Sequence, residues 1–488
     1  MVVGLVLTVA VVLRFLVRSP LWLDEAISVS IARLPLRDIP EALRHDGAPP
    51  LYYLLLKGWL ALPGMSDEGA RWLSGILAVL SLPPMAAAGR RLGDRETGRA
   101  ALLVLASSPF AIYYATEARM YSLLVLLALL AGLLLCRVLE AGRARDVFGL
   151  ALAVTALMLT HYWSVYPLAA AAGWLAWQWR KGRPRARLAL AGLAGGVVGT
   201  APWWPIAIFQ LLHTGTPWAS YLTVNFALGS LRTIAGGRGD APVLLQVVYL
   251  LLAFLGAFGV RRDSAVELRW PPRGPGALLS GAWVATLVLA GLAGLIFGVG
   301  FASRYTSVIL PAVLLAVVAG ISVLPSIRAR TLVLWVTVLL GLVAALPNTW
   351  TPRTTAGRVA SALNREAKPG DLVVYCPDQL APAVSRLLKV PLDQITFPPA
   401  DDLSRVDWLD YRKRIRAAGE PEAFAHRLLG EAGTRDLWLV WAPGYRSFSG
   451  QCNDMRIELQ KRREDNVTVV PFRRRIVEYS SLVHFPAS

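Results

Sequence analysis

The stretch Ser122–Leu139, SLLVLLALLAGLLLCRVL, identifies the kind of protein. It is apolar apart from Arg137 near its end, and its length approaches the ~20 residues that an α-helix needs to cross a bilayer. Apolar stretches of similar length recur on both sides of it, so we expect an all-α polytopic membrane protein. The eleven predicted spans are Met1–Val17, Trp72–Gly89, Ala100–Tyr114, Ser122–Leu139, Val147–Thr160, Trp163–Trp179, Leu188–Leu211, Pro242–Val260, Ala277–Val299, Thr306–Val323 and Thr331–Leu346.

The composition supports this interpretation. The 488 residues are 55% hydrophobic and only 17% charged, and the mean hydropathy is +0.49. Soluble proteins carry about 25% charged residues, so a soluble single domain, a disordered chain, a collagen and a disulfide-rich mini-protein are excluded. The net charge of +18 comes mainly from residues 1–350, among the apolar spans. A nucleic-acid-binding protein would instead gather its basic residues on one soluble face, so we expect membrane lipids and no nucleic acid as partners.

Basic residues in alternate loops predict the topology. Cytoplasmic loops of membrane proteins are enriched in Lys and Arg, and five alternate loops here are basic. They place the N-terminus inside and the C-terminus outside. The first span has no basic leader and no small-residue cleavage site before Trp22, which favours an anchor over a signal peptide. Only 6 of the 50 basic residues are Lys, which is typical of GC-rich codon usage, so we expect a bacterial plasma membrane. The residues of these loops are Arg90, Arg91, Arg95, Arg99, Arg137, Arg143, Arg145, Arg180, Lys181, Arg183, Arg185, Arg187, Arg261, Arg262, Arg269, Arg273, Arg328 and Arg330.

Two domains follow from the change in composition near residue 350. Residues 1–350 form the predicted transmembrane domain, with long external loops at 18–71 and 213–240. In the first loop, Pro50–Leu62 is apolar but too short to span, and it is typical of an interfacial helix, with Tyr52, Tyr53 and Trp59 suited to the headgroup region. Residues 351–488 alternate short strands with helices, which predicts a small extracytoplasmic α/β domain. It carries no phosphate loop or nucleophile motif, so we interpret it as a lid or a binding module.

The three cysteines allow one disulfide. Cys136 lies in an apolar span, whereas Cys376 and Cys452 both lie in the external domain. An oxidising compartment would permit a disulfide between these two, and two separate buried thiols are an equal alternative. No Cys/His cluster has the spacing of a zinc site.

The first external loop holds paired ionisable groups. Asp24 and Glu25 directly follow the first span; they suit a helix N-terminus, and they could equally act as a carboxylate base that accepts a proton from a hydroxyl. His45 and Asp46 precede a double proline. They are either a solvated pair in a turn or a second acid/base or metal-binding pair.

Arginines beside tyrosines mark two other outer boundaries. Arg119 lies between Glu117 and Tyr121 in one connection, and Arg304 precedes Tyr305 in another. A positioned guanidinium binds phosphate oxygens in bidentate fashion, although an arginine near a membrane end also snorkels to headgroups. A further external residue is His161, either catalytic or interfacial.

Three of these segments together resemble the GT-C glycosyltransferase superfamily. They are WLDEA from Trp22, HDGAPPLYY from His45 and YYATEARMY from Tyr113. The similarity is to glycosyltransferase family 39, which includes protein O-mannosyltransferases and the lipid A aminoarabinose transferase. It covers roughly residues 22–121, extends loosely to Arg304, and does not extend to the C-terminal domain.

The resemblance implies a reaction and roles. Such enzymes move a sugar from a polyprenyl-phosphate carrier to an extracytoplasmic lipid, glycan or protein acceptor. Asp24 falls at the general base, and Arg119 and Arg304 fall where residues would hold the donor phosphate. A single displacement would invert the anomeric carbon. The acidic motif is Asp-Glu in some members and resembles Asp-Xaa-Asp in others, so a divalent metal stays an open possibility.

Two other classes of function remain open. A transporter or flippase of lipid-linked sugars would place ionisable groups near the bilayer midplane and show internal repeats, and neither feature is apparent in the sequence. A non-catalytic membrane protein that binds glycans is the second alternative. The sequence encodes no recognisable preference for one sugar or acceptor.

Overall fold

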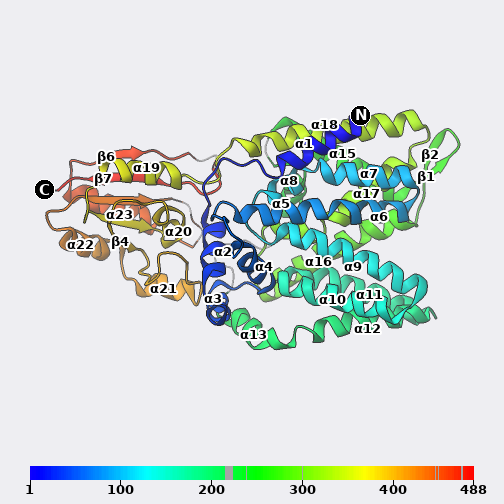
Figure 1. Cartoon of the computed structure of the whole chain (residues 1–488), viewed down its shortest axis with the longest axis horizontal. Coiled ribbons are helices and arrows are strands. Elements are labelled where there is room, and N and C mark those ends of the chain that lie inside the picture. The colour runs from blue at the N-terminus through cyan, green and yellow to red at the C-terminus, as the bar shows by residue number, and fades with distance from the viewer. Residues whose placement is uncertain are drawn as a thin grey trace.

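The computed structural model describes residues 1–214, 224–237, 239–298, 300–443, 445, 447–448, 450–473 and 476–487. Within the predicted external loop 213–240, residues 215–223 and 238 therefore lie outside the described residues. Figure 1 shows a helical bundle on one side and a sheet-containing C-terminal domain on the other. This arrangement confirms the predicted fold class, an α-helical membrane domain with a small α/β domain.

Helices of membrane-spanning type build the bundle. Six helical segments among the described residues are long and apolar enough to cross a bilayer, and Val2–Leu13 and Leu310–Val323 are shorter apolar helices. The number of eleven spans stays a prediction. The elements of the bundle are α1 (Val2–Leu13), α5 (Ala70–Leu80), α6 (Leu82–Leu92), α7 (Arg95–Ala106), α8 (Pro109–Ala115), α9 (Tyr121–Ala141), α10 (Ala144–Thr160), η2 (Tyr162–Ser164), α11 (Val165–Arg180), α12 (Pro184–Val198), η3 (Ala201–Trp203), α13 (Trp204–His213), α14 (Val224–Ile234), α15 (Asp240–Phe258), α16 (Pro275–Phe297), η4 (Ser303–Val308), α17 (Leu310–Val323), α18 (Ile327–Ala345) and η5 (Leu346–Thr349), with a hairpin of β1 (Gly259–Arg262) and β2 (Ala265–Leu268).

Proline explains why some predicted spans are interrupted. The predicted span Ala100–Tyr114 is divided into α7 and α8, and Pro109 occupies the first position of α8. Pro lacks the N–H that a continuing helix needs, but it fits the first turn of a new one. Pro202 and Pro205 likewise separate α12, η3 and α13 within Leu188–Leu211.

Glycine permits the closest helix contact in the bundle. A Cβ atom on Gly320 of α17 would lie 1.9 Å from the carbonyl oxygen of Leu252 in α15. Small residues allow membrane helices to approach to backbone contact, which replaces the missing hydrophobic drive between helices in lipid. A larger side chain at Gly320 would force α15 and α17 apart.

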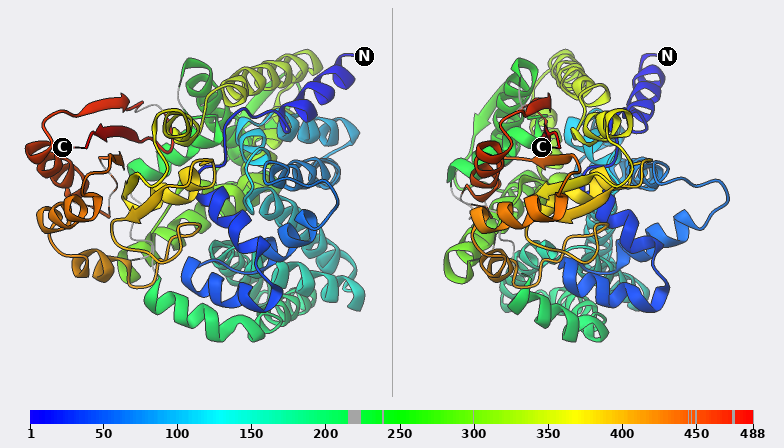
Figure 2. Two further views of the ribbon diagram at one scale, coloured as in Figure 1. Left: turned by 60° about the vertical axis from the view of Figure 1, so that its left-hand side comes forward. Right: turned by 90° about the vertical axis from the view of Figure 1, so that its left-hand side faces the viewer.

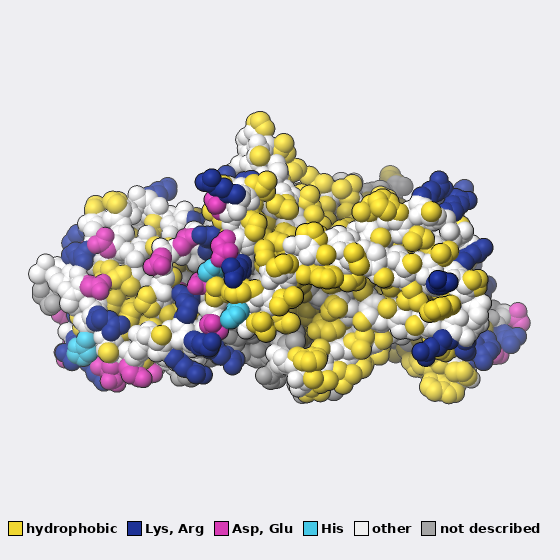
Figure 3. All heavy atoms as spheres, turned by 90° about the horizontal axis from the view of Figure 1, so that it is seen from below, with side chains coloured by type: hydrophobic (Ala, Val, Ile, Leu, Met, Phe, Trp, Pro, Cys, Tyr) yellow, Lys and Arg dark blue, Asp and Glu magenta, His cyan; other side chains and the backbone are white. Residues whose placement is uncertain are grey.

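The outer surface of the bundle fits lipid. Figure 3 shows a broad apolar belt, with Lys and Arg side chains gathered at the end of the bundle farthest from the C-terminal domain. Leu211, Leu295 and Phe297 are each 76% exposed, which a bilayer rather than water would accommodate. The chain is therefore a multi-pass membrane protein. Its orientation remains the prediction made from the basic loops.

Short helices lie between the bundle and the C-terminal domain (Figures 1 and 2). They include a helix within the predicted interfacial segment Pro50–Leu62 and the helix whose first turn contains Asp24. Gly47 ends the helix Ile39–Asp46 in the left-handed conformation, with φ of +80°, which favours glycine. These elements are α2 (Leu23–Arg33), η1 (Leu36–Asp38), α3 (Ile39–Asp46) and α4 (Leu51–Leu60).

A mixed five-stranded sheet forms the centre of the C-terminal domain. Its strand order is β4-β3-β5-β7-β6, with β3 parallel to β4 and β5 and the remaining pairs antiparallel. The central strands β3 and β5 are fully buried. Its elements are α19 (Ala356–Glu366), β3 (Leu372–Cys376), η6 (Asp378–Leu380), α20 (Ala381–Ser385), β4 (Asp393–Thr396), α21 (Tyr411–Ala417), α22 (Pro421–Ala432), β5 (Leu437–Trp441), α23 (Gln451–Arg462), β6 (Val467–Val470) and β7 (Ser481–Phe485).

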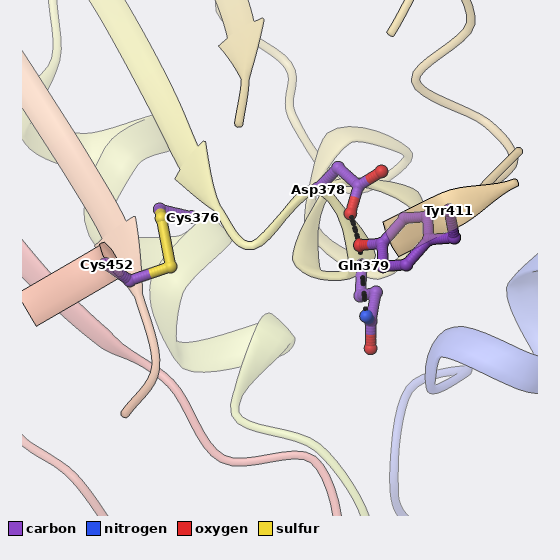
Figure 4. The surroundings of a disulfide bond; sticks show 5 residues. All are labelled: Cys376, Asp378, Gln379, Tyr411 and Cys452. Atoms are coloured by element: carbon purple, nitrogen blue, oxygen red, sulfur yellow. Dashed lines mark hydrogen bonds between the residues drawn. A yellow bond between two sulfur atoms is a disulfide. The ribbon is translucent and has the colours of Figure 1, made fainter. Parts of the chain in front are cut away.

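A disulfide fastens this domain internally. Cys376, at the end of β3, is bonded to Cys452 in α23 (Figure 4). Of the two alternatives open for these residues, the structure has the disulfide. Beside it, the buried Asp378 accepts a hydrogen bond from the Tyr411 hydroxyl, which in turn accepts one from Gln379 Nε2 at 3.1 Å.

Candidate active site

Three predicted residues meet at one point above the bundle. Asp24 lies in the first turn of α2, Arg119 in the connection between α8 and α9, and Arg304 in η4. Asp24 Oδ2 is 3.3 Å from Arg304 Nη1 and 4.0 Å from Arg119 Nε. The three side chains are 13–20% exposed, so this cluster lies in a largely desolvated environment that remains open to a ligand.

Arg119 is held in place by neutral groups. Its Nη1 donates to Ser28 Oγ at 3.0 Å and to Tyr53 Oη at 3.2 Å. Tyr53 Oη in turn donates to Asp46 Oδ2 at 2.7 Å, so Asp46 joins the cluster through the tyrosine. The sequence singled out Asp46 but interpreted Tyr53 as a headgroup tyrosine. Its position in the HDGAPPLYY segment, seven residues after Asp46, was the signal available.

The cluster carries an excess of positive charge. Two guanidinium groups face the single carboxylate of Asp24, and burial raises the pKa of Asp46 above its usual range, although the charge of Arg119 opposes this. Guanidinium groups are well suited to phosphate because their planar N–H pairs match its oxygens. The arrangement can therefore accept one more anion beside Asp24.

Glu25 does not share this environment. Its side chain is 0% exposed and forms a bidentate ion pair with Arg71, with Nε–Oε1 and Nη2–Oε2 distances of 2.7 and 2.5 Å. Glu25 Oε1 also accepts the backbone N–H of Ala118 at 2.8 Å. Glu25 thus ties α2 to α5 and to the segment that carries Arg119, and its catalytic role stays a prediction.

His45 and Asp46 separate rather than act as a pair. Asp46 points to Tyr53, whereas His45 Nδ1 lies 2.8 Å from Asp407 of the C-terminal domain, and its Nε2 lies 3.4 Å from Glu41. The expected second acid/base or metal pair is therefore divided between two sites. Among the described residues, no group of three or more His, Cys, Asp or Glu lies together as metal ligands would.

The other residues singled out in the sequence, Glu117, Tyr121, His161 and Tyr305, lie around the cluster. The buried Glu117 lies 3.9 Å from Arg353 Nη1, and burial raises its pKa to about 7. His161 packs against Tyr305, with ring centroids 4.7 Å apart, and against Tyr121 at 6.3 Å. Burial, together with the positive charge of Arg119 and Arg304, lowers the pKa of His161 to about 3. His161 therefore lies among the aromatic side chains beside the cluster, in surroundings that favour its neutral form.

Comparisons with known proteins agree with this fold. Residues 47–206 match the family described as dolichyl-phosphate-mannose-protein mannosyltransferase. No curated protein matches the sequence of the chain. Solved structures with a similar fold are ArnT from Cupriavidus metallidurans bound to undecaprenyl phosphate, with TM-score 0.60, 14% identity and coverage of 100% of this chain and 98% of ArnT, and the same protein in the apo state, with TM-score 0.61, 14% identity and coverage of 99% and 97%.

A larger solved structure is also similar. It is the arabinofuranosyltransferase AftD from Mycobacteria, with TM-score 0.52 and 15% identity over all of this chain and 41% of that one. The fold of the whole chain is thus similar to that of both proteins. The chain therefore has the GT-C glycosyltransferase fold to which its sequence resemblance pointed, with residues 47–206 matching the protein mannosyltransferase family.

Proposed function

We propose that this protein is an inverting glycosyltransferase that moves a sugar from a polyprenyl-phosphate donor to an acceptor on the extracytoplasmic side of the membrane. The observation that carries the proposal is the position of the Asp24 carboxylate between Arg119 and Arg304. A base and two phosphate-binding cations at one point are what such a displacement requires. The fold shared with ArnT, which was solved with undecaprenyl phosphate bound, supports the choice of donor.

The cluster suggests an order for donor binding, proton transfer and sugar transfer. In the free protein Asp24 is paired with Arg304 at 3.3 Å. A donor phosphate would compete for both guanidinium groups and so release the carboxylate. Asp24 then accepts the proton of the acceptor hydroxyl, and the hydroxyl oxygen attacks the anomeric carbon. The bond from that carbon to the phosphate oxygen breaks, and the lipid phosphate leaves with its charge neutralised by Arg119 and Arg304.

The donor phosphate and the two arginines supply the charges that the step needs, so the proposal includes no metal ion. Magnesium or manganese addition and chelation in the transfer assay test this point. Activity that survives chelation agrees with the proposal, and activity lost on chelation and restored by metal contradicts it.

The test is sugar transfer by the purified protein in detergent. Radiolabelled polyprenyl-phosphate mannose, arabinose, glucose and galactose are offered separately with a membrane extract as acceptor. We expect label from one donor to move with the wild type and with Asp38→Asn, an exposed control in the same external loop whose carboxylate pairs only with Arg37 among the described residues. Asp24→Asn should lose transfer while it still binds the donor.

The alternatives predict other outcomes. Transfer that survives in Asp24→Asn would remove Asp24 as the base and make Asp46 the next candidate. Donor binding without transfer in the wild type would favour a glycan-binding protein, and donor movement across vesicle membranes would favour a flippase. The proposal fails in both of these cases.

A further inference from the structure

The C-terminal domain contacts three of the segments that carry residues of the site. Glu478 contacts α2, which carries Asp24, and Arg353 contacts the connection that carries Arg119. Asp407 and Trp408 contact His45 at the end of α3, next to Asp46. The domain therefore touches the supports of the site rather than only covering it, and Figure 1 shows α2 and α3 lying directly against it.

Glu478 completes the N-terminus of α2. The first backbone N–H groups of a helix have no partner within the helix, and Trp22, at the capping position of α2, has no side-chain acceptor to offer them. Glu478 Oε1 accepts the N–H of Leu23 at 3.0 Å across a separation of 455 residues. Leu23 is the residue directly before Asp24, so this contact fixes the turn from which the Asp24 side chain extends.

The backbone of Glu478 is also clamped. Its N–H donates to the carbonyl oxygen of Arg353 at 2.8 Å, and its own carbonyl oxygen accepts the N–H of Thr355 at 3.1 Å. The Arg353 side chain donates to Thr116 O at 2.7 Å, Thr116 Oγ1 at 2.6 Å and Tyr113 O at 3.0 Å. One short parallel β-bridge, between Thr354 and Glu478, thus links the turn of Asp24 to the connection of Arg119.

We propose that Glu478 is a positioning residue, which caps α2 from the C-terminal domain and so holds the Asp24 carboxylate between Arg119 and Arg304. This inference rests on the proposed function for its catalytic consequence, although the cap itself does not depend on it. A displacement of about 1 Å at a reacting group can cost about 100-fold in rate, so a frayed first turn would slow the chemical step.

The chemistry of Glu478 suits this role. Burial raises its pKa to about 8, and the nearby charges of Asp24 and Glu25 act in the same direction. A neutral carboxyl group can accept the Leu23 N–H without adding a further negative charge beside Asp24. A glutamine at this position would provide the same acceptor oxygen.

The test compares Glu478→Ala, which removes the acceptor, with Glu478→Gln, which keeps it. Glu431→Ala is the matched control, because Glu431 is an exposed glutamate of the same domain. We expect Glu478→Ala to lower kcat about 10-fold or more, with the donor KM changed by less than about 2-fold. Glu478→Gln and Glu431→Ala should stay within about 2-fold of the wild type. If Glu478→Ala does not fold, Glu478→Asp, which shortens the side chain by one methylene group, replaces it.

Amide hydrogen exchange of the peptide containing Leu23–Ala26 provides a readout that needs no transfer. We expect faster exchange there in Glu478→Ala than in Glu478→Gln. Unchanged exchange, or faster exchange with an unchanged kcat, would overturn the inference. If the wild type transfers no sugar while the exchange difference is present, the proposed function and the catalytic consequence both fail, and only the cap remains.

Discussion

The buried ion pair between Glu25 and Arg71 allows a quantitative test of the division of roles in α2. Glu25 accepts four hydrogen bonds, two from Arg71 and one each from the N–H groups of Ala118 and Trp22. Both side chains are at most 6% exposed. Removal of one partner of a buried pair leaves an uncompensated charge and costs about 3–5 kcal/mol. We expect Glu25→Ala to lower the free energy of unfolding by this amount.

The assay is reversible unfolding in mixed detergent and dodecyl sulfate micelles, followed by intrinsic fluorescence. Arg71→Ala should cost a similar amount. The double variant should cost less than the sum of the two single variants by about 2–3 kcal/mol, because it leaves neither charge buried alone. Asp38→Asn is the control, since the Asp38 side chain is 48% exposed, and we expect it to change the free energy of unfolding by less than about 1 kcal/mol.

Two results would refute this reasoning. A Glu25→Ala protein that unfolds within about 1 kcal/mol of the wild type would show that the ion pair is not a structural support. Additive costs in the double variant would show that the two side chains act independently. A folded Glu25→Gln variant that loses transfer as completely as Asp24→Asn would return Glu25 to the list of catalytic residues.

Three further predictions concern the C-terminal domain. Mass spectrometry after alkylation without reductant should find one free thiol among the three cysteines. Replacement of Cys376 and Cys452 by Ser should lower the free energy of unfolding by about 4 kcal/mol, because the disulfide closes a loop of 76 residues. Burial raises the folded-state pKa of Glu478 from 4.5 to about 8, so its contribution to stability is fully present below pH 4.5 and is lost as the pH rises through 8. The thermal midpoint of the wild type should therefore fall over this range relative to that of Glu478→Gln. Arg386→Ala breaks a 2.7 Å ion pair with the partly exposed Asp67 and should lower the free energy of unfolding by no more than about 1 kcal/mol in the same assay. A larger decrease would contradict the view that this pair contributes little to stability.

The sequence predicted what depends on local pattern. The span Ser122–Leu139 became α9, because an apolar stretch of that length needs no distant partner to form a helix in a bilayer. The residues Asp24, Arg119 and Arg304 were identified because each lies at an outer helix end beside other polar or aromatic residues. Tyr53 was assigned to the headgroup region and Glu478 was not singled out. Their contacts join distant parts of the chain; Glu478 lies in no motif, and the place of Tyr53 in the HDGAPPLYY segment does not by itself specify the contact with Arg119.

Asp24 and Glu25 are adjacent in the sequence but lie in different environments. Consecutive residues of an α-helix point about 100° apart, so two neighbouring carboxylates in α2 cannot both face the same ligand. Asp24 faces the two arginines of the site, while Glu25 faces Arg71 of α5. The first-turn position suits both, since acidic groups are stabilised at a helix N-terminus. A pair of acidic residues after a membrane span therefore fixes the location of the site, but the orientation of the helix decides which of them can act as the base. The Glu25 ion pair holds that orientation on one side and, as we propose, the Glu478 cap holds it on the other, so the residues that would make Asp24 reactive are those that hold its helix.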